Sequence, residues 1–434
     1  MISQHDLKGV VIDNNTVVNS VPARPSRNQR RRALHVFPVT FLLLAQYLGL
    51  VIYPAIVHQT APLSTILEIC IVAICSGFVI ELLLVPIRAS RIPYPSVSLR
   101  SAKAITVIGW IAQLVVAHTG QLGYASQISE GGRSSLAALA TPFQFWALFG
   151  MSLIYFGFQQ GQAKRFNVLA WTGATLGIQL FVSLQQAILA PFFVLTLTLI
   201  FLGLLVGLFR LRIVVLLLIL LPILWPAIYA VRNQIRISEG ANATELALSS
   251  SSQRLRLDLE MAQIQNFSSI PADLPVPGIV TLVRFGIIPS VIDRSRGNIN
   301  SAQILSTAMG GSSTNSASLT TLGELYVEQG WGGLIIYGSL MASMVGYFIR
   351  RRGPWALVMI AIVVSQFLWI GETVPDYLAG FLQTLVSLLV VWIVVKALSG
   401  ESFGRRRRPL EVQSHTFSKR RSDNSSESNL LRSD

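Results

Sequence analysis

Charged residues are scarce in this chain. Of its 434 residues only 12% are Asp, Glu, Lys or Arg, whereas 52% are hydrophobic. A soluble domain carries roughly twice that charged fraction, because charged surface keeps it dispersed. The composition therefore excludes a soluble globular protein of this size. It predicts an all-α integral membrane protein, since a lipid-facing surface needs no charge.

Cysteine and histidine are also rare. The only two cysteines, Cys70 and Cys75, lie within one apolar stretch, which excludes a disulfide framework and a cysteine-based metal site. His58 and His118 are isolated near predicted helix ends, where a structural or interfacial role is expected. We therefore expect no metal ion and no cofactor. A cleavable signal peptide is not predicted either, because the first apolar stretch follows a long polar tail and is long enough to remain as an anchor.

Long apolar stretches make up most of the chain. A membrane-spanning helix needs roughly 20 apolar residues, and the run from Phe166 to Phe209 is too long for one helix. The polar segment from Ser183 to Gln186 divides that run into two. About ten transmembrane helices follow, at residues 34–57, 63–87, 104–119, 142–160, 167–184, 187–209, 212–231, 331–349, 354–372 and 377–398.

The net charge of +14 is a signal of topology and not of nucleic-acid binding, because the basic residues form short runs between apolar stretches. Successive runs are two predicted helices apart, so all fall on one side, which the positive-inside rule makes cytoplasmic. Both termini are then cytoplasmic. The expected organisation is a basic cytoplasmic tail (1–33), helices one to seven (34–231), a large extracytoplasmic loop (232–330), helices eight to ten (331–398) and a disordered basic cytoplasmic tail (399–434).

The large loop contains segments of different character. Residues Gln253–Ile264 alternate apolar and charged side chains, which fits either a short amphipathic helix or a strand. Residues Val276–Ile292 are apolar but interrupted by prolines, so an interfacial or re-entrant piece is predicted. A Ser/Thr/Asn/Gly-rich stretch, Asn298–Thr321, is expected to be mobile. The segment Leu322–Gly330 leads directly into the eighth helix.

Two of these segments carry a resemblance. TLGELYVEQGWGGLIIYG (Thr321–Gly338) resembles the GELY-type motif that enters a late transmembrane helix in Wzy-type polymerases of oligosaccharide repeat units, the O-antigen and exopolysaccharide polymerases. FGIIPSVIDRSRG (Phe285–Gly297) is similar to the "IP" segment of that family. Many members carry an arginine directly after the proline, where this chain has Ser290, so Arg294 or Arg284 is the candidate for that role.

The resemblance implies polymerisation of undecaprenyl-pyrophosphate-linked repeat units at the outer face of a bacterial cytoplasmic (inner) membrane. It implies as partners the lipid-linked oligosaccharide, the lipid bilayer, and chain-length regulator and flippase proteins, with no nucleic acid. The chemistry has two requirements: the leaving pyrophosphate must be stabilised, and the acceptor hydroxyl needs a base. The lipid diphosphate is already activated, so no nucleotide is required.

Arginine suits the first requirement because its planar fork binds phosphate oxygens in two places. Glu324, at the entrance to the eighth helix, is the leading candidate for the base, and Arg284 for stabilising the pyrophosphate. If the helix has already begun, Glu324 and Glu328 share a face, although acids are also favoured in a first turn by the helix dipole. The substrate-binding candidates are Arg254, Arg256, Arg294, Arg296, Tyr326 and Glu328.

Other polar and small residues allow simpler interpretations. Glu81, near the cytoplasmic end of the second helix, is expected to pair with Arg88 or to face water. The GxxxG pairs Gly173/Gly177 and Gly203/Gly207 predict close helix packing. Four glutamines inside predicted spans are candidates for lining a path through the bundle: Gln46, Gln113, Gln179 and Gln366.

Three rival functions fit the layout. An O-antigen ligase is expected to carry a histidine in its large external loop, and none lies between Arg232 and Gly330. A polyprenyl-phosphate-sugar glycosyltransferase would need acids in the first external loop, which is tiny here. A transporter or flippase of polysaccharide precursors would show internal repeats and charges at the midplane, and the sequence has no repeat and few such charges.

Overall fold

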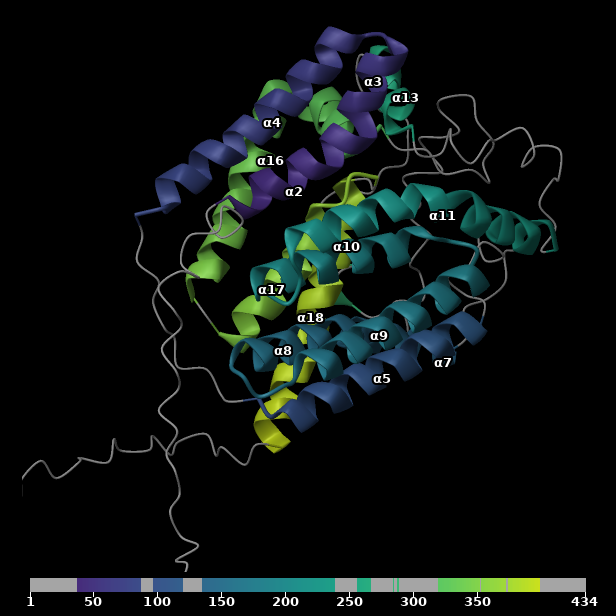
Figure 1. The fold of residues 1–434 in the computed structure, drawn as a ribbon, viewed down its shortest axis with the longest axis vertical. Helices are drawn as coiled ribbons and strands as arrows, with labels where there is room; N and C mark the ends of the chain where they lie inside the picture. The colour runs from purple at the N-terminus through teal and green to yellow at the C-terminus, as the bar shows by residue number, and fades with distance from the viewer. Residues whose placement is uncertain are drawn as a thin grey trace, which may run out of the picture.

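The computed structural model describes residues 37–86, 97–119, 135–238, 256–266, 284, 287–288, 319–351, 353–371 and 374–398. Every regular element in these ranges is helical, and none is a strand. Figure 1 shows the helices as one elongated body. The two predicted tails and most of the predicted large loop lie outside the described residues.

The first half of the chain forms helices in the order α2 (Pro38–Tyr47), α3 (Tyr53–His58), α4 (Leu63–Leu84), α5 (Leu99–His118), α7 (Ser135–Ala140), α8 (Trp146–Gln159), α9 (Arg165–Gln185), α10 (Ala190–Leu205) and α11 (Leu211–Ser238). A π-helical turn, η2 (Leu48–Ile52), joins α2 to α3, and a 3₁₀ turn, η3 (Thr141–Phe145), precedes α8. The second half contains α13 (Leu257–Ala262), the 3₁₀ turn η5 (Gln263–Asn266), α16 (Thr321–Arg351), α17 (Pro354–Phe367) and α18 (Val374–Leu398).

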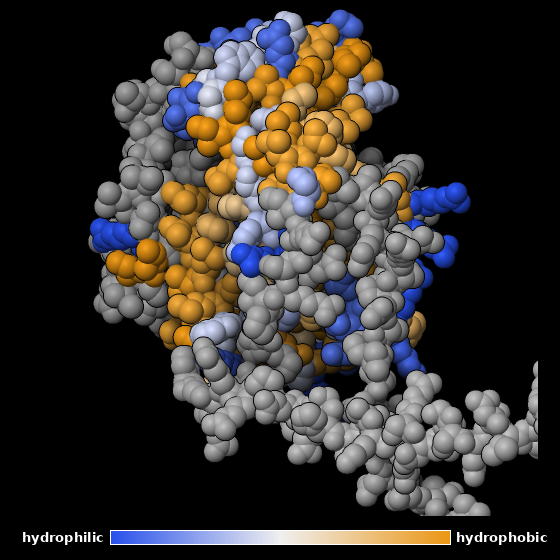
Figure 2. All heavy atoms as spheres, turned by 90° about the vertical axis from the view of Figure 1, so that its left-hand side faces the viewer, coloured by the Kyte–Doolittle hydropathy of each residue, from blue (hydrophilic) through white to orange (hydrophobic). Residues whose placement is uncertain are grey.

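Six helical segments within the described residues are long and apolar enough to cross a membrane, and they identify a membrane protein. They are Pro38–His58, Leu63–Leu84, Leu99–His118, Arg165–Gln185, Thr321–Arg351 and Gly380–Ala397. Their outer surfaces are apolar: Leu83 on α4 is 65% exposed and Ile336 on α16 is 67% exposed. Figure 2, which faces the α4 and α16 side of the molecule, shows a broad apolar area over these helices. Such a surface is stable against lipid and not against water.

The helices form two groups that α17 connects. In one group α16 packs along α4, with α2 beside them, and in the other α5 packs against α8 and α9 (Figure 1). Helix α17 contacts both α16 and α8. This arrangement brings α2 close to α16 and α17, which lie far from it in the sequence.

Close helix crossings occur at glycines other than the predicted ones. A Cβ on Gly109 of α5 would lie 2.1 Å from the backbone nitrogen of Ala147 in α8, and a Cβ on Gly338 of α16 would lie 2.4 Å from the carbonyl oxygen of Ala73 in α4. At Gly173 and Gly177 a Cβ would meet nothing within 4 Å. The GxxxG interpretation is therefore wrong for that pair, because its glycines face away from neighbouring helices.

The second GxxxG pair is also not a helix crossing. Gly203 is covered by the ring of Phe209 in its own C-terminal turn, and Gly207 ends α10 with a φ of +78°. A glycine in this left-handed conformation terminates a helix without steric cost. These two glycines form the C-terminal end of α10 and do not pack it against another helix.

The predicted helix boundaries hold in some places and shift in others. The break proposed near Gln185 is confirmed, since α9 ends there and α10 begins at Ala190. Residues 257–262 form the helix α13, which decides between the helix and strand interpretations. Helix α5 begins at Leu99 and not at 104, because Ser98 caps it by accepting a hydrogen bond from the backbone N–H of Ser101. Helix α11 continues to Ser238, seven residues beyond the predicted end at 231.

Helix α16 begins at Thr321, ten residues before the predicted start at 331, but its backbone is interrupted at Gly330, just before that predicted start. Gly330 has φ +60° and ψ −155°, a conformation that is open essentially only to glycine. Residues Thr321–Gln329 therefore form a short helical segment of their own, which we call the entry segment. The predicted start coincides with the second half of α16.

Replacing Gly330 with alanine is expected to destabilise the junction by about 1–3 kcal/mol, because the new Cβ forces an unfavourable backbone conformation. The space around both Gly330 and Gly332 is open to a Cβ, so neither variant introduces a clash, and Gly332 does not have the positive φ. Gly332→Ala is therefore the matched control and should be neutral or slightly stabilising. Thermal unfolding in detergent measures both, and equal melting temperatures would contradict this account.

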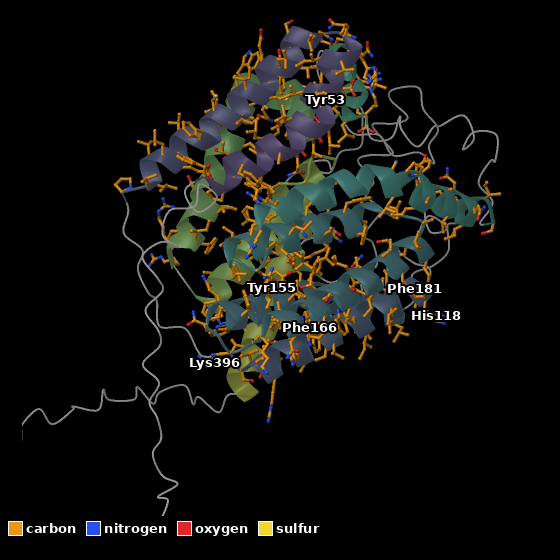
Figure 3. All side chains as sticks on the ribbon, in the orientation of Figure 1. Tyr53, His118, Tyr155, Phe166, Phe181 and Lys396 are labelled. Carbon is orange, nitrogen blue, oxygen red and sulfur yellow. The ribbon has the colours of Figure 1, made fainter. Side chains whose placement is uncertain are left out.

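The two ends of the bundle differ in charge. In Figure 3 His118 and Phe181 lie toward one end of the α5–α9 pair, and Phe166 and Lys396 toward the other. The described basic residues of the second end, which we call the basic end, are Arg100, Lys103, Lys164, Arg165, Arg210, Arg212, Arg350, Arg351 and Lys396. The first end includes the start of α16, and we call it the Glu324 end.

Glu81 lies at the basic end and is buried, so it does not face water; Arg88, its other predicted partner, lies outside the described residues. The side chain of Glu81 accepts the backbone N–H groups of Val39 at 2.6 Å and Thr40 at 3.2 Å. These donors belong to the first turn of α2 and have no partner within the helix. The carboxylate also interacts electrostatically with Arg350 of α16. Glu81 therefore joins α2, α4 and α16, a role that its sequence position did not reveal.

Candidate functional site

Seven consecutive residues at the start of the entry segment and just before it, Leu319–Leu325, are buried. Thr320 caps it: its hydroxyl accepts a hydrogen bond from the backbone N–H of Gly323 at 3.3 Å. Thr320 has a φ of +63°, which is unusual for a β-branched residue and unfavourable in energy. A strained residue at a buried helix start is held by the surrounding structure, and such positions are frequent at functional sites.

Three partners from other helices hold the entry segment in place. The backbone N–H of Thr321 donates to the carbonyl of Ile370 at 3.1 Å, and its hydroxyl donates to the carbonyl of Trp369 at 3.0 Å. The hydroxyl of Tyr47, at the end of α2, accepts the backbone N–H of Leu322 at 3.3 Å. The polar groups at this helix start are therefore satisfied by α2 and by the end of α17.

Glu324 lies in the first turn of this segment and is only 3% exposed. Its neighbour Gly323 sits under Ile264 of η5, where a Cβ would lie 3.2 Å from the isoleucine methyl. Burying a carboxylate is costly unless other groups compensate, and the first turn of a helix is one of the few places that favours a negative charge. Glu324 is thus a buried acid at a helix start, and the glycine before it lies against Ile264 of η5.

The other two predicted residues of the entry segment are more accessible. Glu328 lies one helical turn after Glu324, as predicted, but is exposed. The ring of Tyr326 is partly buried and packs edge-on against Trp331, with ring centroids 4.8 Å apart. This contact spans the Gly330 break and gives Tyr326 a packing role.

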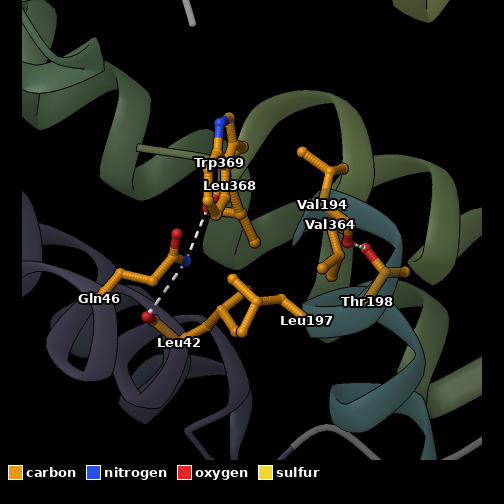
Figure 4. Close-up of a pocket in the computed structure, with 8 residues that line it drawn as sticks. All are labelled: Leu42, Gln46, Val194, Leu197, Thr198, Val364, Leu368 and Trp369. Atoms are coloured by element: carbon orange, nitrogen blue, oxygen red, sulfur yellow. Dashed lines mark hydrogen bonds between the residues drawn. The ribbon is translucent and has the colours of Figure 1, made fainter. Parts of the chain in front are cut away.

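A small cavity lies beside the entry segment, between α2, α10 and α17 (Figure 4). It is about the size of one water molecule and is lined by Leu42, Gln46, Val194, Leu197, Thr198, Val364, Leu368 and Trp369. The side-chain nitrogen of Gln46 donates to the carbonyl of Leu368 at 2.7 Å, whereas its oxygen has no hydrogen-bond partner. A single water molecule in this cavity would satisfy that oxygen.

The proposed path of glutamines is only partly reflected in the structure. Gln46 lines the cavity, whereas Gln113 donates to the carbonyl of Gln144 at 3.2 Å and Gln179 lies 3.4 Å from the hydroxyl of Ser183 in its own helix. Each of these three glutamines has a different partner, and of the three only Gln46 lines the cavity. They stabilise helix packing where they occur.

Helix α13 is tied to the turn between α3 and α4 by a cluster of three polar side chains. Arg256 donates from Nε to one oxygen of Asp258 at 3.0 Å and from Nη2 to the other at 2.6 Å. The hydroxyl of Thr60 donates to Asp258 at 2.6 Å. Burial disfavours the charged carboxylate, but the hydrogen bonds from Arg256 and Thr60 outweigh it and hold the pKa of Asp258 below its usual range. Arg256, a predicted substrate ligand, is therefore engaged in docking α13.

Removing Arg256 should loosen this docking more than removing Asp258. Arg256→Ala leaves a fully buried carboxylate with only the Thr60 hydroxyl, which costs about 3 kcal/mol or more, whereas Asp258→Ala leaves a guanidinium that is 24% exposed and can reach water. Hydrogen exchange of residues 257–266 measures the opening. Faster exchange in Asp258→Ala than in Arg256→Ala would contradict the order.

The same cluster makes the docking of α13 depend on pH in a direction that can be predicted. The pKa of Asp258 is depressed from 3.8 in the folded state, so its contribution to stability is fully present above that value. It is lost as the pH falls from there through the folded-state pKa. Exchange of α13 should therefore rise below about pH 4 in the wild-type protein. Asp258→Asn should remove this dependence, and an unchanged profile in that variant would show that another group titrates.

Of the four remaining predicted arginines, the structure describes one. Arg284 is described, and its side chain is exposed. Its backbone carbonyl accepts the N–H of Ile288 at 2.9 Å. Arg254, Arg294 and Arg296 lie outside the described residues, as does the Ser/Thr-rich stretch up to residue 318.

Two arginines that the sequence argument passed over, Arg232 and Arg236, converge at the Glu324 end. Each donates from Nε to the carbonyl oxygen of Ala187, at 3.1 Å in both cases. They are four residues apart on α11, which places both on one face of that helix. The sequence does contain a signal for them. The helical pattern of α11 continues past residue 231, and the two arginines there lie at the end of the bundle that the charge pattern predicts to be poor in basic residues.

An aromatic cluster lies directly beneath these arginines. It consists of Phe193, Trp225 and Tyr229, with Phe192 and Trp369 packed against it. The guanidinium of Arg232 lies over the ring of Tyr229 at 5.0 Å, a favourable cation–π contact. Trp369 also accepts the hydroxyl hydrogen bond of Thr321 through its carbonyl. One residue thus connects the aromatic cluster to the start of the entry segment.

No family model, curated protein or solved structure matches the chain significantly. The site must therefore be interpreted from its own chemistry. At one end of the bundle the described residues place a buried carboxyl group at a helix start, an arginine pair above an aromatic cluster, and the docked α13–η5 segment, whose Ile264 lies against Gly323. Within the described ranges, no group of three or more His, Cys, Asp and Glu could hold a metal ion.

Proposed function

We propose that this chain is a polysaccharide polymerase of the inner membrane, which joins undecaprenyl-pyrophosphate-linked oligosaccharide repeat units at the outer face. The growing glycan leaves its lipid diphosphate and is transferred to a hydroxyl of the incoming unit. The observation that carries the proposal is the burial of Glu324 in the entry segment, because that segment is also the one whose sequence resembles the Wzy-type polymerases.

The proposal places the Glu324 end outside the cell and the basic end in the cytoplasm, with about ten spans and both termini inside. The positive-inside rule supports this orientation, since most described Lys and Arg residues gather at the basic end. The two shorter apolar helices, α10 and α17, together with α8, α11 and the six candidate spans, make up the proposed ten. The catalytic centre is then at the external membrane surface, where lipid-linked substrates arrive.

The polar groups of the Glu324 end match the two requirements of the reaction. A carboxylate can accept the proton of the acceptor hydroxyl, and guanidinium groups can stabilise the charge that develops on the leaving diphosphate. Proton transfer and charge stabilisation are both side-chain chemistry. Arg284, whose side chain is exposed, is the proposed catalytic arginine, with Arg254, Arg256, Arg294, Arg296, Tyr326 and Glu328 as proposed substrate contacts.

The test is polymerisation by the purified protein. In detergent, without nucleotide sugar or added metal, a lipid-linked repeat unit should be converted into a ladder of longer lipid-linked glycans. Arg284→Ala should abolish the ladder and leave membrane insertion intact. A protein that forms no ladder but moves the lipid-linked unit across liposome membranes would be a flippase, and transfer of the glycan to a different acceptor would indicate a ligase.

A further inference from the structure

We propose that Gln46 of α2 is a positioning residue for Glu324, and that one water molecule bound in the cavity beside it completes its site. Within the described residues Gln46 makes no hydrogen bond to the entry segment itself. It acts through the residues in which α17 ends, and these residues hold the entry segment. The inference rests on the proposed function for the role of Glu324 but not for its geometry.

The end of α17 presents four consecutive backbone carbonyls, those of residues 367–370, and each accepts a hydrogen bond from another helix. Tyr337 of α16 donates to the first, and the side chain of Gln46 donates to the second at 2.7 Å. Thr321 of the entry segment donates to the third at 3.0 Å and to the fourth at 3.1 Å. Carbonyls at the end of a helix have no partner within it. We call these four residues the carbonyl run, and it joins α2 to the entry segment.

The hydrogen bond from Gln46 lies directly next to those that hold Thr321. Leu368 accepts the first and Trp369 accepts the hydroxyl of Thr321. Because each peptide unit is rigid, a displacement of the Leu368 carbonyl is passed to the residue that follows it. Thr321 lies three residues before Glu324, within one helical turn. The position of Glu324 therefore depends on the hydrogen bond that Gln46 makes.

Helix α2 thus acts on the entry segment in two ways. Tyr47 contacts the segment directly, since its hydroxyl accepts the backbone N–H of Leu322 at 3.3 Å. Gln46, the residue before it, acts through the carbonyl run. Gln46 is 6% exposed and Leu368 is 2% exposed, so bulk water cannot replace this hydrogen bond. A buried carbonyl that loses its donor is unfavourable, and the carbonyl run would have to shift to find another.

The oxygen of the Gln46 amide indicates the bound water. The amide cannot be reversed, because its oxygen would then face the carbonyl oxygen of Leu368, and neither can donate. The oxygen is therefore fixed away from Leu368, and it has no hydrogen-bond partner among the described residues. Gln46 lines the cavity shown in Figure 4, which is about the size of one water molecule. Water has the size and the donors that this oxygen requires.

A second polar group for the water lies on α10. A buried water usually makes two or more hydrogen bonds, and Thr198 lines the same cavity as Gln46. The hydroxyl of Thr198 donates to the carbonyl of Val194 at 2.7 Å, and its oxygen can still accept a hydrogen bond. A water that donates one hydrogen to Gln46 and the other to Thr198 would link α2 to α10 beside the carbonyl run.

Positioning is tested by comparing Gln46→Met with Gln179→Met. Both glutamines are 6% exposed, and both variants exchange an amide for a thioether, but Gln179 bonds to Ser183 in its own helix. We expect Gln46→Met to lower kcat for polymerisation about 10–100-fold with little change in KM, because a displaced base affects the chemical step. Gln179→Met should leave kcat unchanged. Wild-type kcat in Gln46→Met, or equal losses in both variants, would overturn the positioning role.

Hydrogen exchange of residues 321–329 tests the same role without polymerisation. Exchange should be faster in Gln46→Met than in the wild-type protein and in Gln179→Met. If the wild-type protein makes no glycan ladder and exchange rises only in Gln46→Met, the positioning stands and the proposed function fails. A wild-type ladder with unchanged exchange in Gln46→Met gives the opposite result. If Gln46→Met does not fold, Gln46→Asn and Gln179→Asn provide the same comparison, because asparagine keeps the amide but is one methylene shorter.

The bound water is tested by filling the cavity with Val194→Ile. The added methylene should displace the water and leave the oxygen of Gln46 without a partner, so the melting temperature should fall. An unchanged or higher melting temperature would show that the cavity is dry and overturn the water. In the Gln46→Met background the same substitution should no longer lower the melting temperature. An equal fall in both backgrounds would indicate a steric clash and also refute the water.

Discussion

Replacing Glu324 with glutamine is expected to reduce glycan polymerisation by about 10²–10⁴-fold, the usual contribution of a positioned general base. Glutamine keeps the size and the hydrogen-bonding geometry of the side chain but cannot accept the hydroxyl proton. The residue is buried in a helix start that α2 and the end of α17 hold, so the change should affect chemistry more than folding. The measurement is the rate at which the lipid-linked ladder grows at saturating substrate.

Glu328→Gln provides the matched comparison. It makes the same chemical change one helical turn later, at an exposed position in the same segment. We expect at most a severalfold loss, since an exposed carboxylate has little influence on a buried reaction centre. If Glu324→Gln polymerises at the wild-type rate, Glu324 has no part in the mechanism. If both variants lose activity equally, the segment contributes charge and not a specific base.

The largest effect on stability is expected from Gly109→Ala. A Cβ at this position would lie 2.1 Å from the nitrogen of Ala147 and 2.7 Å from its Cα, and backbone atoms of a packed helix cannot move aside independently. Helices α5 and α8 would have to separate along their contact, which costs about 3 kcal/mol or more. The expected result is loss of folded protein after extraction, or a clearly lower melting temperature.

Gly173→Ala on α9 is the control for this variant. Here the new methyl group meets nothing within 4 Å, and alanine is the better helix former by about 1 kcal/mol. The melting temperature should stay constant or rise slightly. A comparable loss in both variants would mean that these glycines matter for helix flexibility and not for the close approach of α5 to α8.

Much of the helical framework could be predicted, because span length and charge placement are properties of single segments. The break at Gln185 is one example, since polar residues inside a long apolar run are visible in the sequence. Glycine packing could not be predicted in the same way. The GxxxG pattern at Gly173 occurs without a partner helix, while Gly109 and Gly338 make close contacts without any pattern, because contact depends on which helix lies opposite.

The same distinction applies to the candidate site: local features could be predicted from the sequence, whereas contacts between distant residues could not. The position of Glu324 at a helix entrance follows from local sequence, but its burial depends on how distant parts of the chain pack there, such as Ile264 against Gly323 and Trp369 on Thr321. Arg256 shows the opposite case: its position outside the spans suggested ligand binding, and only the spatial arrangement reveals Asp258 and Thr60 as its partners. The convergence of Arg232 and Arg236 could not be predicted, because the carbonyl of Ala187 that both contact lies 45 and 49 residues earlier in the chain.

The break at Gly330 has a mechanical consequence. In an uninterrupted helix, rotating the membrane-crossing part by one residue would turn every side chain by about 100°, including Glu324. Because Gly330 breaks the helical backbone conformation, the direction of the entry segment is set separately from that of the crossing part. Tyr47 and Trp369 orient the entry segment, whereas the close approach of Gly338 to Ala73 fixes the crossing part against α4. The orientation of Glu324 is therefore decided by contacts at the end of the bundle and not by the packing of the membrane-crossing helix.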